Sequence, residues 1–147
     1  MSTKGTVLPT YLAGGDFAHK YADYFPPWLD KMVDDVTLEG SMLDGVVQGP
    51  ETVRSIVLMI RSMYDRQEFN YAGPYGDENG WLEDYIAQVH GGEPLGCVVL
   101  VRRDAKGETQ SVTASYRPRS SLMLFSRLLG EKFAGPVIGE QFASSDS

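Results

Sequence analysis

Two patterns meet in the stretch VTLEGSMLDGVVQGPETVRSIVLMIRSMY, residues 36–64. From Val36 to Leu43 apolar and polar residues alternate, as they do in a strand with one buried face. Gly49 and Pro50 interrupt that pattern, and the apolar residues that follow recur at helical spacing. A strand followed directly by an amphipathic helix predicts that the helix packs on a sheet.

The predicted helix begins at Pro50, whose missing N–H has no partner in a first helical turn. Glu51 complements the positive end of the helix dipole. Leu58 and Met59 widen the apolar stripe, so we expect the helix to be covered on more than one side. The stripe consists of Val53, Ile56, Val57, Ile60, Met63 and Tyr64, and the opposite, polar side carries Arg54, Ser55, Arg61 and Ser62.

Aromatic residues precede this stretch, and turn residues divide the chain after it. Residues 17–25 place four aromatic side chains on one helical face, and a short helix is predicted at 28–33. Downstream, the pattern predicts a curved antiparallel sheet, with Val98 to Val101 apolar on both faces and therefore covered on both. After Pro118, Ser120 or Ser121 caps a final helix that ends near Phe133. The predicted strands centre on residues 69–71, 81–90, 95–103 and 108–116, with a turn at 77–80 and a hairpin at 91–92.

Length and composition predict one domain spanning residues 1–147, with a core at about 16–133 and flexible ends at 1–10 and 134–147. The sequence has no apolar run long enough to cross a membrane and no signal-peptide pattern. Its single cysteine, Cys97, is typical of a reducing compartment, which favours the cytoplasm. The net charge of −7 argues against general nucleic-acid binding.

Three segments carry a resemblance to a known superfamily: WLDKMVDDVTLEG (28–40), GVVQGPETVRSIV (45–57) and CVVLVRRDAKGETQSVTASYRP (97–118). Their order, over roughly residues 17–118, resembles the nuclear transport factor 2-like (NTF2-like) superfamily, in particular its SnoaL-like branch of polyketide cyclase and ketosteroid isomerase-like proteins. The resemblance implies an α+β fold in which a cone-shaped, bent antiparallel sheet wraps around N-terminal helices, with a helix at the C-terminus. It also implies an apolar pocket inside the cone and a homodimer formed through the convex sheet face.

The resemblance also implies where catalytic carboxylates would lie. The aspartate base of the isomerases falls at Gly40, and their protonated carboxylic acid falls at Val99. Both carboxylates are absent, so isomerase chemistry by that route is not expected. Arg102-Arg103-Asp104 copies the letters of the Arg-x-Asp motif of epoxide hydrolases, but it lies at a predicted hairpin turn and we discount it.

Glu83 and Tyr85 are the candidate catalytic residues, because they share the strand face expected to line the pocket. Desolvation would raise the pKa of a carboxyl group there and suit it to general base catalysis. The alternative is a carboxylate on the pocket rim. Asp84 lies on the opposite strand face. Glu39 would become the pocket carboxylate only if the first strand were turned over.

Aromatic residues supply the candidate ligand site. Tyrosine hydroxyls in an apolar pocket can orient a flat, oxygenated molecule, although the same residues could instead simply pack the core. Cys97 is expected to be a buried thiol rather than a nucleophile. His19 and His90 are too far apart to suggest a metal site, and we predict no cofactor. The candidate ligand-binding residues are Tyr24, Trp28, Tyr64, Tyr71, Cys97, Val99 and Tyr116.

These observations favour a SnoaL-like protein that binds a small, apolar, ring-containing compound. If the protein is catalytic, general acid–base chemistry without a metal is expected. Two alternatives stay open at this point: a non-catalytic dimerisation or adaptor module, and a passive ligand carrier.

Overall fold

The computed structural model describes residues 24–89, 94–133 and 142. Six strands form one sheet in the order β2-β1-β6-β5-β4-β3. Neighbouring strands are antiparallel except β1 and β6, which run parallel. The elements are the 3₁₀ helix η2 (Pro27–Leu29), β1 (Met32–Gly40), β2 (Val47–Gln48), α2 (Pro50–Ser62), β3 (Tyr64–Tyr75), β4 (Asp77–Val89), β5 (Pro94–Arg103), β6 (Thr109–Arg117) and α3 (Arg119–Lys132).

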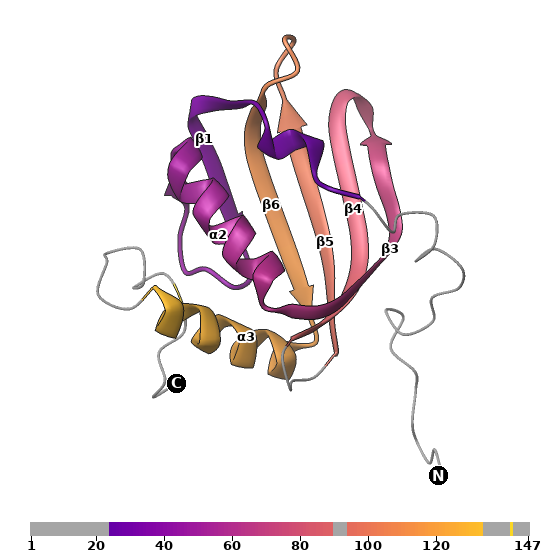
Figure 1. Cartoon of the computed structure of the whole chain (residues 1–147). Helices are drawn as coiled ribbons and strands as arrows, with labels where there is room; N and C mark the ends of the chain where they lie inside the picture. Colours follow the sequence, from indigo (N-terminus) through magenta and orange to yellow (C-terminus); the bar gives the residue numbers. More distant parts are fainter. Residues whose placement is uncertain (1–23, 90–93, 134–141, 143–147) are drawn as a thin grey trace.

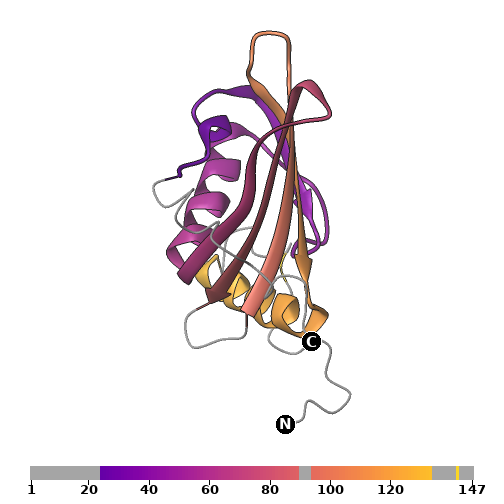
Figure 2. The same ribbon diagram turned by 90° about the vertical axis from the view of Figure 1, so that its right-hand side faces the viewer.

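The sheet bends, and all three helical elements lie on its concave side (Figures 1 and 2). In Figure 1, α2 lies in front of β1 and β6, α3 crosses below the sheet, and η2 lies near its upper end. The predicted α+β class, with a curved sheet and a C-terminal helix, is confirmed. No helix in the described part of the chain is long and apolar enough to cross a membrane.

The core lies between α2 and the concave face. The helix buries Val53, Ile56 and Ile60, as its periodicity predicts. Strand β5 buries every second residue, namely Leu95, Cys97, Val99 and Val101. Phe125 of α3 is fully buried and packs against the rings of Tyr64 and Tyr116.

Several predicted boundaries differ from the structure. The predicted helix at 28–33 is reduced to η2, because β1 already begins at Met32. The β3–β4 turn lies at Gly76, whose φ of 83° suits glycine, so residues 77–80 belong to β4. The N-cap of α3 is Pro118, and neither predicted serine caps the helix. The predicted helix at 17–25 and the tip of the hairpin at 91–92 lie outside the described residues, apart from Tyr24 and Phe25.

Two surfaces are less covered than predicted. Leu58 on α2 is 42% exposed, so the helix is open on its outer side. Leu100 on the convex face of β5 is 38% exposed, whereas its neighbours Val99 and Val101 are buried against the core. On the convex face of β5, Gly96 is buried and Val98 is partly buried, so the described residues cover this face less completely than the concave one.

Gly40 marks a close approach between β1 and β6. A Cβ atom at this position would lie 2.1 Å from the carbonyl oxygen of Ala114, and that oxygen also accepts a hydrogen bond from Ser41 N. The two strands therefore leave no room for a side chain at Gly40.

We predict that Gly40→Ala destabilises the protein by about 1–3 kcal/mol, the usual result of forcing extra atoms into a packed site. Urea unfolding followed by tryptophan fluorescence would measure the change. Ser55→Ala, an exposed change on α2, serves as the control and should stay within about 0.5 kcal/mol of the parent. Equal stability of Gly40→Ala and the parent would contradict the close approach.

Candidate functional site

A single carboxyl group lies on a row of residues that crosses the sheet. Strand pairing aligns Gly40 with Ala114, Ala114 with Val99, and Val99 with Glu83. Gly40 and Val99 are the positions where the resemblance places the two isomerase carboxylates. The row instead carries its carboxyl group one strand further on, at Glu83 of β4.

Glu83 is buried, with 3% of its surface exposed. Its Oε2 atom accepts two hydrogen bonds, from Tyr24 Oη at 2.5 Å and from Trp28 Nε1 at 2.8 Å. Trp81 also contributes a hydrogen-bonding interaction to the Glu83 carboxyl group. Protein donors therefore hold Glu83 in place, and the residue lines the adjoining cavity.

Trp81 extends this network toward the end of the sheet. It shares the concave face of β4 with Glu83, and its Nε1 donates to Tyr24 Oη at 2.9 Å. The guanidinium group of Arg103 lies over the Trp81 ring, 5.4 Å from the ring centre. Tyr24 thus accepts a hydrogen bond from Trp81 and donates one to Glu83, which fixes the direction of both bonds.

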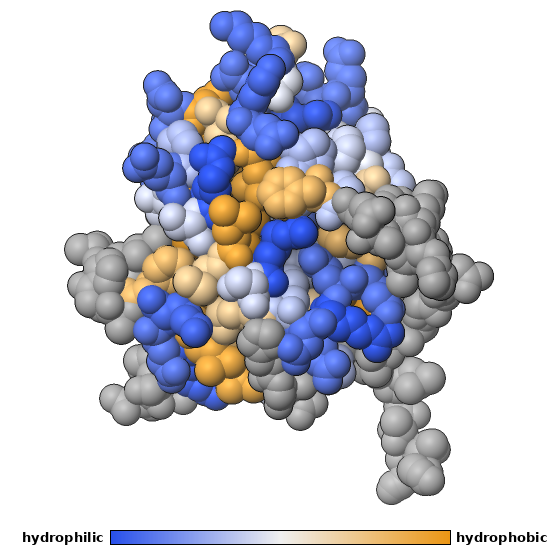
Figure 3. Space-filling view, viewed as in Figure 1, coloured by the Kyte–Doolittle hydropathy of each residue, from blue (hydrophilic) through white to orange (hydrophobic). Residues whose placement is uncertain are grey.

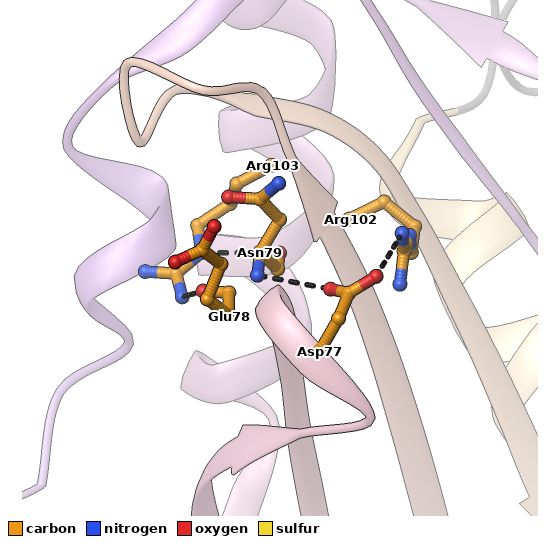
Figure 4. Close-up of polar contacts among 5 residues, drawn as sticks. All are labelled: Asp77, Glu78, Asn79, Arg102 and Arg103. Carbon is orange, nitrogen blue, oxygen red and sulfur yellow. Dashed lines mark hydrogen bonds and ion pairs between the residues drawn. The ribbon is translucent and has the colours of Figure 1, made fainter.

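The hairpin end beside Trp81 separates the two neighbouring arginines (Figure 4). Arg103 reaches the carbonyl oxygens of Asn79 and Glu78 at 3.4 Å, while Arg102 pairs with Asp77 on the other side of β5. Asp104 lies in the following turn, where it accepts backbone N–H groups. The Arg-Arg-Asp sequence therefore does not form one site.

Side chains from distant elements anchor η2, which carries Trp28. Thr109 Oγ1 donates to the carbonyl oxygen of Trp28 at 2.8 Å, and Arg54 Nη2 donates to that of Leu29 at 2.5 Å. Thr109 is fully buried. Strand β6 and helix α2 thus position the indole that holds Glu83.

Burial raises the pKa of Glu83 above its ordinary value, and the hydrogen bonds from Tyr24 and Trp28 oppose that rise. The positive charge of Arg61 opposes it as well. Burial and the neighbouring Glu83 carboxylate raise the pKa of Tyr24, so its hydroxyl keeps its proton. The site therefore holds an acid of raised pKa beside neutral hydrogen-bond donors.

Glu83 opens onto a cavity between the sheet, η2 and α2, which we call the Glu83 cavity. Its empty volume is about 410 Å³ when adjoining open solvent is included. The volume that the centre of a water molecule can reach is only about 30 Å³. The smaller volume limits an occupant and admits about two waters. The lining is formed by Pro26, Trp28, Leu38, Met42, Val57, Ile60, Arg61, Gln67, Glu83, Tyr85, Val99, Val112, Ala114 and Tyr116.

Three tyrosines cluster at one end of this cavity. Tyr64 Oη lies 2.7 Å from Tyr85 Oη and 3.4 Å from Tyr116 Oη. Burial raises the pKa of all three hydroxyls. Burial also raises the pKa of the fully buried Cys97 to about 12, which leaves its thiol protonated and a poor nucleophile.

The structure brings most of the predicted site residues together. Trp28, Glu83, Tyr85, Val99 and Tyr116 line the Glu83 cavity. Tyr24 reaches the site through its bond to Glu83, and Tyr64 through its bond to Tyr85. Cys97 lies in the core beside the tyrosine cluster.

Three other residues lie outside this site. Tyr71 is 38% exposed and bonds to the carbonyl oxygen of Pro74, so it does not reach the Glu83 cavity. Glu39 is exposed, because Leu38 is the β1 residue that faces the cavity. Asp84 lies on the convex face, as its place beside Glu83 in the strand predicts.

Sequence patterns did not predict Trp81, Gln67 or Arg61 as site residues. Strand alternation could have found Trp81, which lies two residues before Glu83. Arg61 was assigned to the polar side of α2, yet it lines the Glu83 cavity near the end of the helix. No group of three potential metal ligands occurs among the described residues, and His19 and His90 lie outside them.

A scan with protein-family models finds no match to this sequence, and neither does a search of curated proteins. Solved structures do match. A steroid delta-isomerase from Pseudomonas aeruginosa has a TM-score of 0.66 at 18% identity, over 72% of this chain and 77% of its own. An uncharacterised bacterial protein with a cystatin-like fold, from Silicibacter pomeroyi, has a TM-score of 0.66 at 13% identity, over 74% of both chains.

An NTF-2 like protein of unknown function from Burkholderia xenovorans has a TM-score of 0.50 at 15% identity, over 63% of this chain and 73% of its own. At such identities the likeness concerns the fold. The chain has the NTF2-like fold that its sequence resembles, so that prediction is confirmed for the fold.

The raised pKa of Glu83 predicts a pH-dependent stability. Below about pH 4.5, its ordinary value, the group is protonated in both the folded and unfolded states. As the pH rises toward the raised pKa of the folded state, Glu83 ionises readily in the unfolded state but not in the folded one. The free energy of unfolding therefore falls over this range. Glu83→Gln removes this titration and keeps a carbonyl oxygen for Tyr24 and Trp28.

The free energy of unfolding of the parent minus that of Glu83→Gln should therefore fall between pH 4 and pH 8, by about 1.4 kcal/mol for each unit of pKa shift. Urea unfolding at several pH values would measure it. Glu39→Gln, at an exposed position, should give a nearly constant difference. Parallel curves for the parent and Glu83→Gln would mean that burial does not shift the Glu83 pKa.

Proposed function

We propose that this chain is a SnoaL-like small-molecule enzyme. It binds a compact, apolar, ring-containing compound in the Glu83 cavity and moves a proton on it by general acid–base chemistry. The observation that carries the proposal is the buried Glu83 carboxyl group, which Tyr24 and Trp28 hold through Oε2 and which lines the cavity.

The arrangement suits proton abstraction next to a carbonyl group. A carboxylate of raised pKa is closer to the pKa range in which general bases work near neutral pH. Fixing Oε2 with two donors holds the carboxyl group in one orientation beside the cavity. Tyr85 and Tyr116 line the same cavity and keep their protons, so their hydroxyls can donate to a developing oxyanion.

The cavity restricts the ligand to something small. Its space admits about two waters, so a ring enters only if side chains at the mouth move. Arg61 and Gln67 have long side chains there and can move without disturbing the core. A single-ring compound therefore fits the proposal better than a multi-ring one.

A non-catalytic adaptor is not favoured. Burying a carboxyl group costs stability, and a protein that only dimerises gains nothing from one aimed into a cavity. A passive carrier needs the cavity but no group of raised pKa.

Deuterium exchange into cyclic ketones tests the proposal. A general base that removes a proton beside a carbonyl exchanges it with solvent, which NMR in D₂O detects as loss of the α-proton signal. We expect the parent to accelerate exchange in cyclohexanone or cyclopentanone and Glu83→Gln to lose roughly a hundredfold or more of that rate. Glu39→Gln should retain the parent rate. Equal rates for the parent and Glu83→Gln would refute Glu83 as the base.

The convex face supports a second part of the proposal, a homodimer. Leu100 is 38% exposed, and it lies on this face with Leu82, Ile86 and Val98. Asp84 Oδ1 is buried without a hydrogen bond, and Arg117 Nη2 lies 4.0 Å from it, too far for one. A second copy packed on this face could cover the apolar side chains and supply the missing donor.

We predict that Leu100→Asp converts the dimer to monomer at micromolar concentration, because it places a charge at the centre of the contact. Sedimentation velocity would measure the change. Leu58→Asp is the matched control, since Leu58 is 42% exposed on the outer side of α2 and lies outside the proposed interface. A parent that sediments as a monomer would refute the dimer.

The cytoplasm is the proposed location. This proposal depends on the presence of a single cysteine, Cys97, which fits a reducing compartment.

A further inference from the structure

We propose that the ligand carries a carboxylate, which Arg61 binds at the mouth of the Glu83 cavity with Gln67 beside it. This inference rests on the proposed function, because it names the class of compound that the same cavity takes. Three observations carry it: the place of Arg61 in the cavity lining, the lack of hydrogen-bond or ion-pair partners for it among the described residues, and the charges in the cavity.

Arg61 lies in the last turn of α2 and lines the cavity together with Val57 and Ile60 of the same helix. It is partly buried, and its guanidinium group lies over the Phe25 ring, 5.0 Å from the ring centre. The ring covers one face of the guanidinium plane and leaves its N–H edges open. Those edges are the part of arginine that binds carboxylates in pairs of parallel hydrogen bonds.

None of the described residues forms a hydrogen bond or an ion pair with Arg61. Other arginines of the chain are engaged: Arg54 donates to a carbonyl oxygen, and Arg66 and Arg102 pair with carboxylates. Arg61 thus brings five N–H donors to a partly buried place without using them on described side chains. Its position near the C-terminus of α2 favours a positive charge, but an exposed side chain would serve that purpose equally well.

Gln67 of β3 lines the same cavity and also has no side-chain hydrogen bond among the described residues. Its amide can donate to one carboxylate oxygen while Arg61 binds the other or both. In Figure 3, hydrophilic residues lie among hydrophobic ones on this face of the molecule. The cavity lining is mostly apolar, with Arg61 and Gln67 among its polar residues.

The charges inside the cavity favour an anion at Arg61. Of the described residues that line it, Arg61 carries the only positive charge and Glu83 the only carboxyl group. The positive charge of Arg61 acts on Glu83, but no hydrogen bond or ion pair joins the two side chains, so the Arg61 donors are not used on Glu83. A ligand carboxylate on Arg61 would leave the ring of the ligand against Leu38, Val99 and Ala114, with a ring atom facing Glu83.

Benzoate and benzamide test this inference, because they have the same shape and differ in charge. Titration followed by ¹⁵N chemical shifts would measure both affinities at neutral pH. We expect the parent to bind benzoate at least tenfold more tightly than benzamide and Arg61→Gln to lose that preference while its benzamide affinity changes less than twofold. Arg61→Lys should keep part of the preference, since it keeps the charge but loses the fork of donors.

Arg66→Gln is the matched control, because Arg66 is exposed on β3 and pairs with Glu68. It should leave both affinities unchanged. Equal binding of benzoate and benzamide to the parent, binding of neither, or equal losses of both in Arg61→Gln would each overturn the inference. Thermal unfolding of each variant would separate a loss of binding from a loss of folding.

The outcome is distinguishable from that of the proposed function. Ketone exchange that depends on Glu83, without any preference for benzoate, would leave the enzyme and remove the carboxylate site. Benzoate binding that depends on Arg61, without Glu83-dependent exchange, would leave the site and remove the acid–base function.

Discussion

The concave face of the sheet needs more cover than one helix can provide. Helix α2 has 13 residues and is about 20 Å long, whereas the 13 residues of β4 extend about 43 Å. The rest of the face is covered from other parts of the chain, by η2 near one end and by α3 near the other (Figure 1). The Glu83 cavity lies where the cover from η2 and α2 meets the sheet.

Burying a carboxyl group in such a gap lowers the free energy of unfolding, and the surrounding structure must offset this desolvation penalty. Hydrogen bonds to a charged group contribute about 1.5–3 kcal/mol each, and the two bonds to Oε2 offset part of the desolvation penalty. The direction of the pKa shift indicates that the offset is incomplete, since burial prevails over the bonds that lower it. An apolar residue at Glu83 would fill the gap at no such cost. The buried carboxyl group is therefore not explained by folding stability, which agrees with the chemical role proposed for it.

The spacing of apolar residues predicted those helices and strands whose structure depends on which of their own side chains are buried. The stripe from Val53 to Ile60 and the alternation along β5 each follow from one face being buried, and both are confirmed. Contacts between distant segments were not predictable in this way. The parallel pairing of β1 with β6 depends on the position of β1 in the folded sheet. Whether Arg61 lines the cavity depends on how the end of α2 packs against β3. For the site, strand alternation placed Glu83 and Tyr85 on one face, but the hydrogen bonds from Tyr24 and Trp28 required the path of the chain through η2.

The row from Gly40 to Glu83 limits what kind of acid–base chemistry the site can perform. With Gly40 closed by the Ala114 carbonyl and Val99 apolar, the row offers one carboxyl group where the resembled isomerases use two. One carboxylate can remove a proton and return it, provided that the developing negative charge is held by other donors. Tyr85, Tyr116 and Arg61 line the same cavity and could supply those donors. The proposed function therefore requires a substrate whose oxygen atoms reach the tyrosines while its acidic carbon faces Glu83, which is a condition on substrate shape as well as on reactivity.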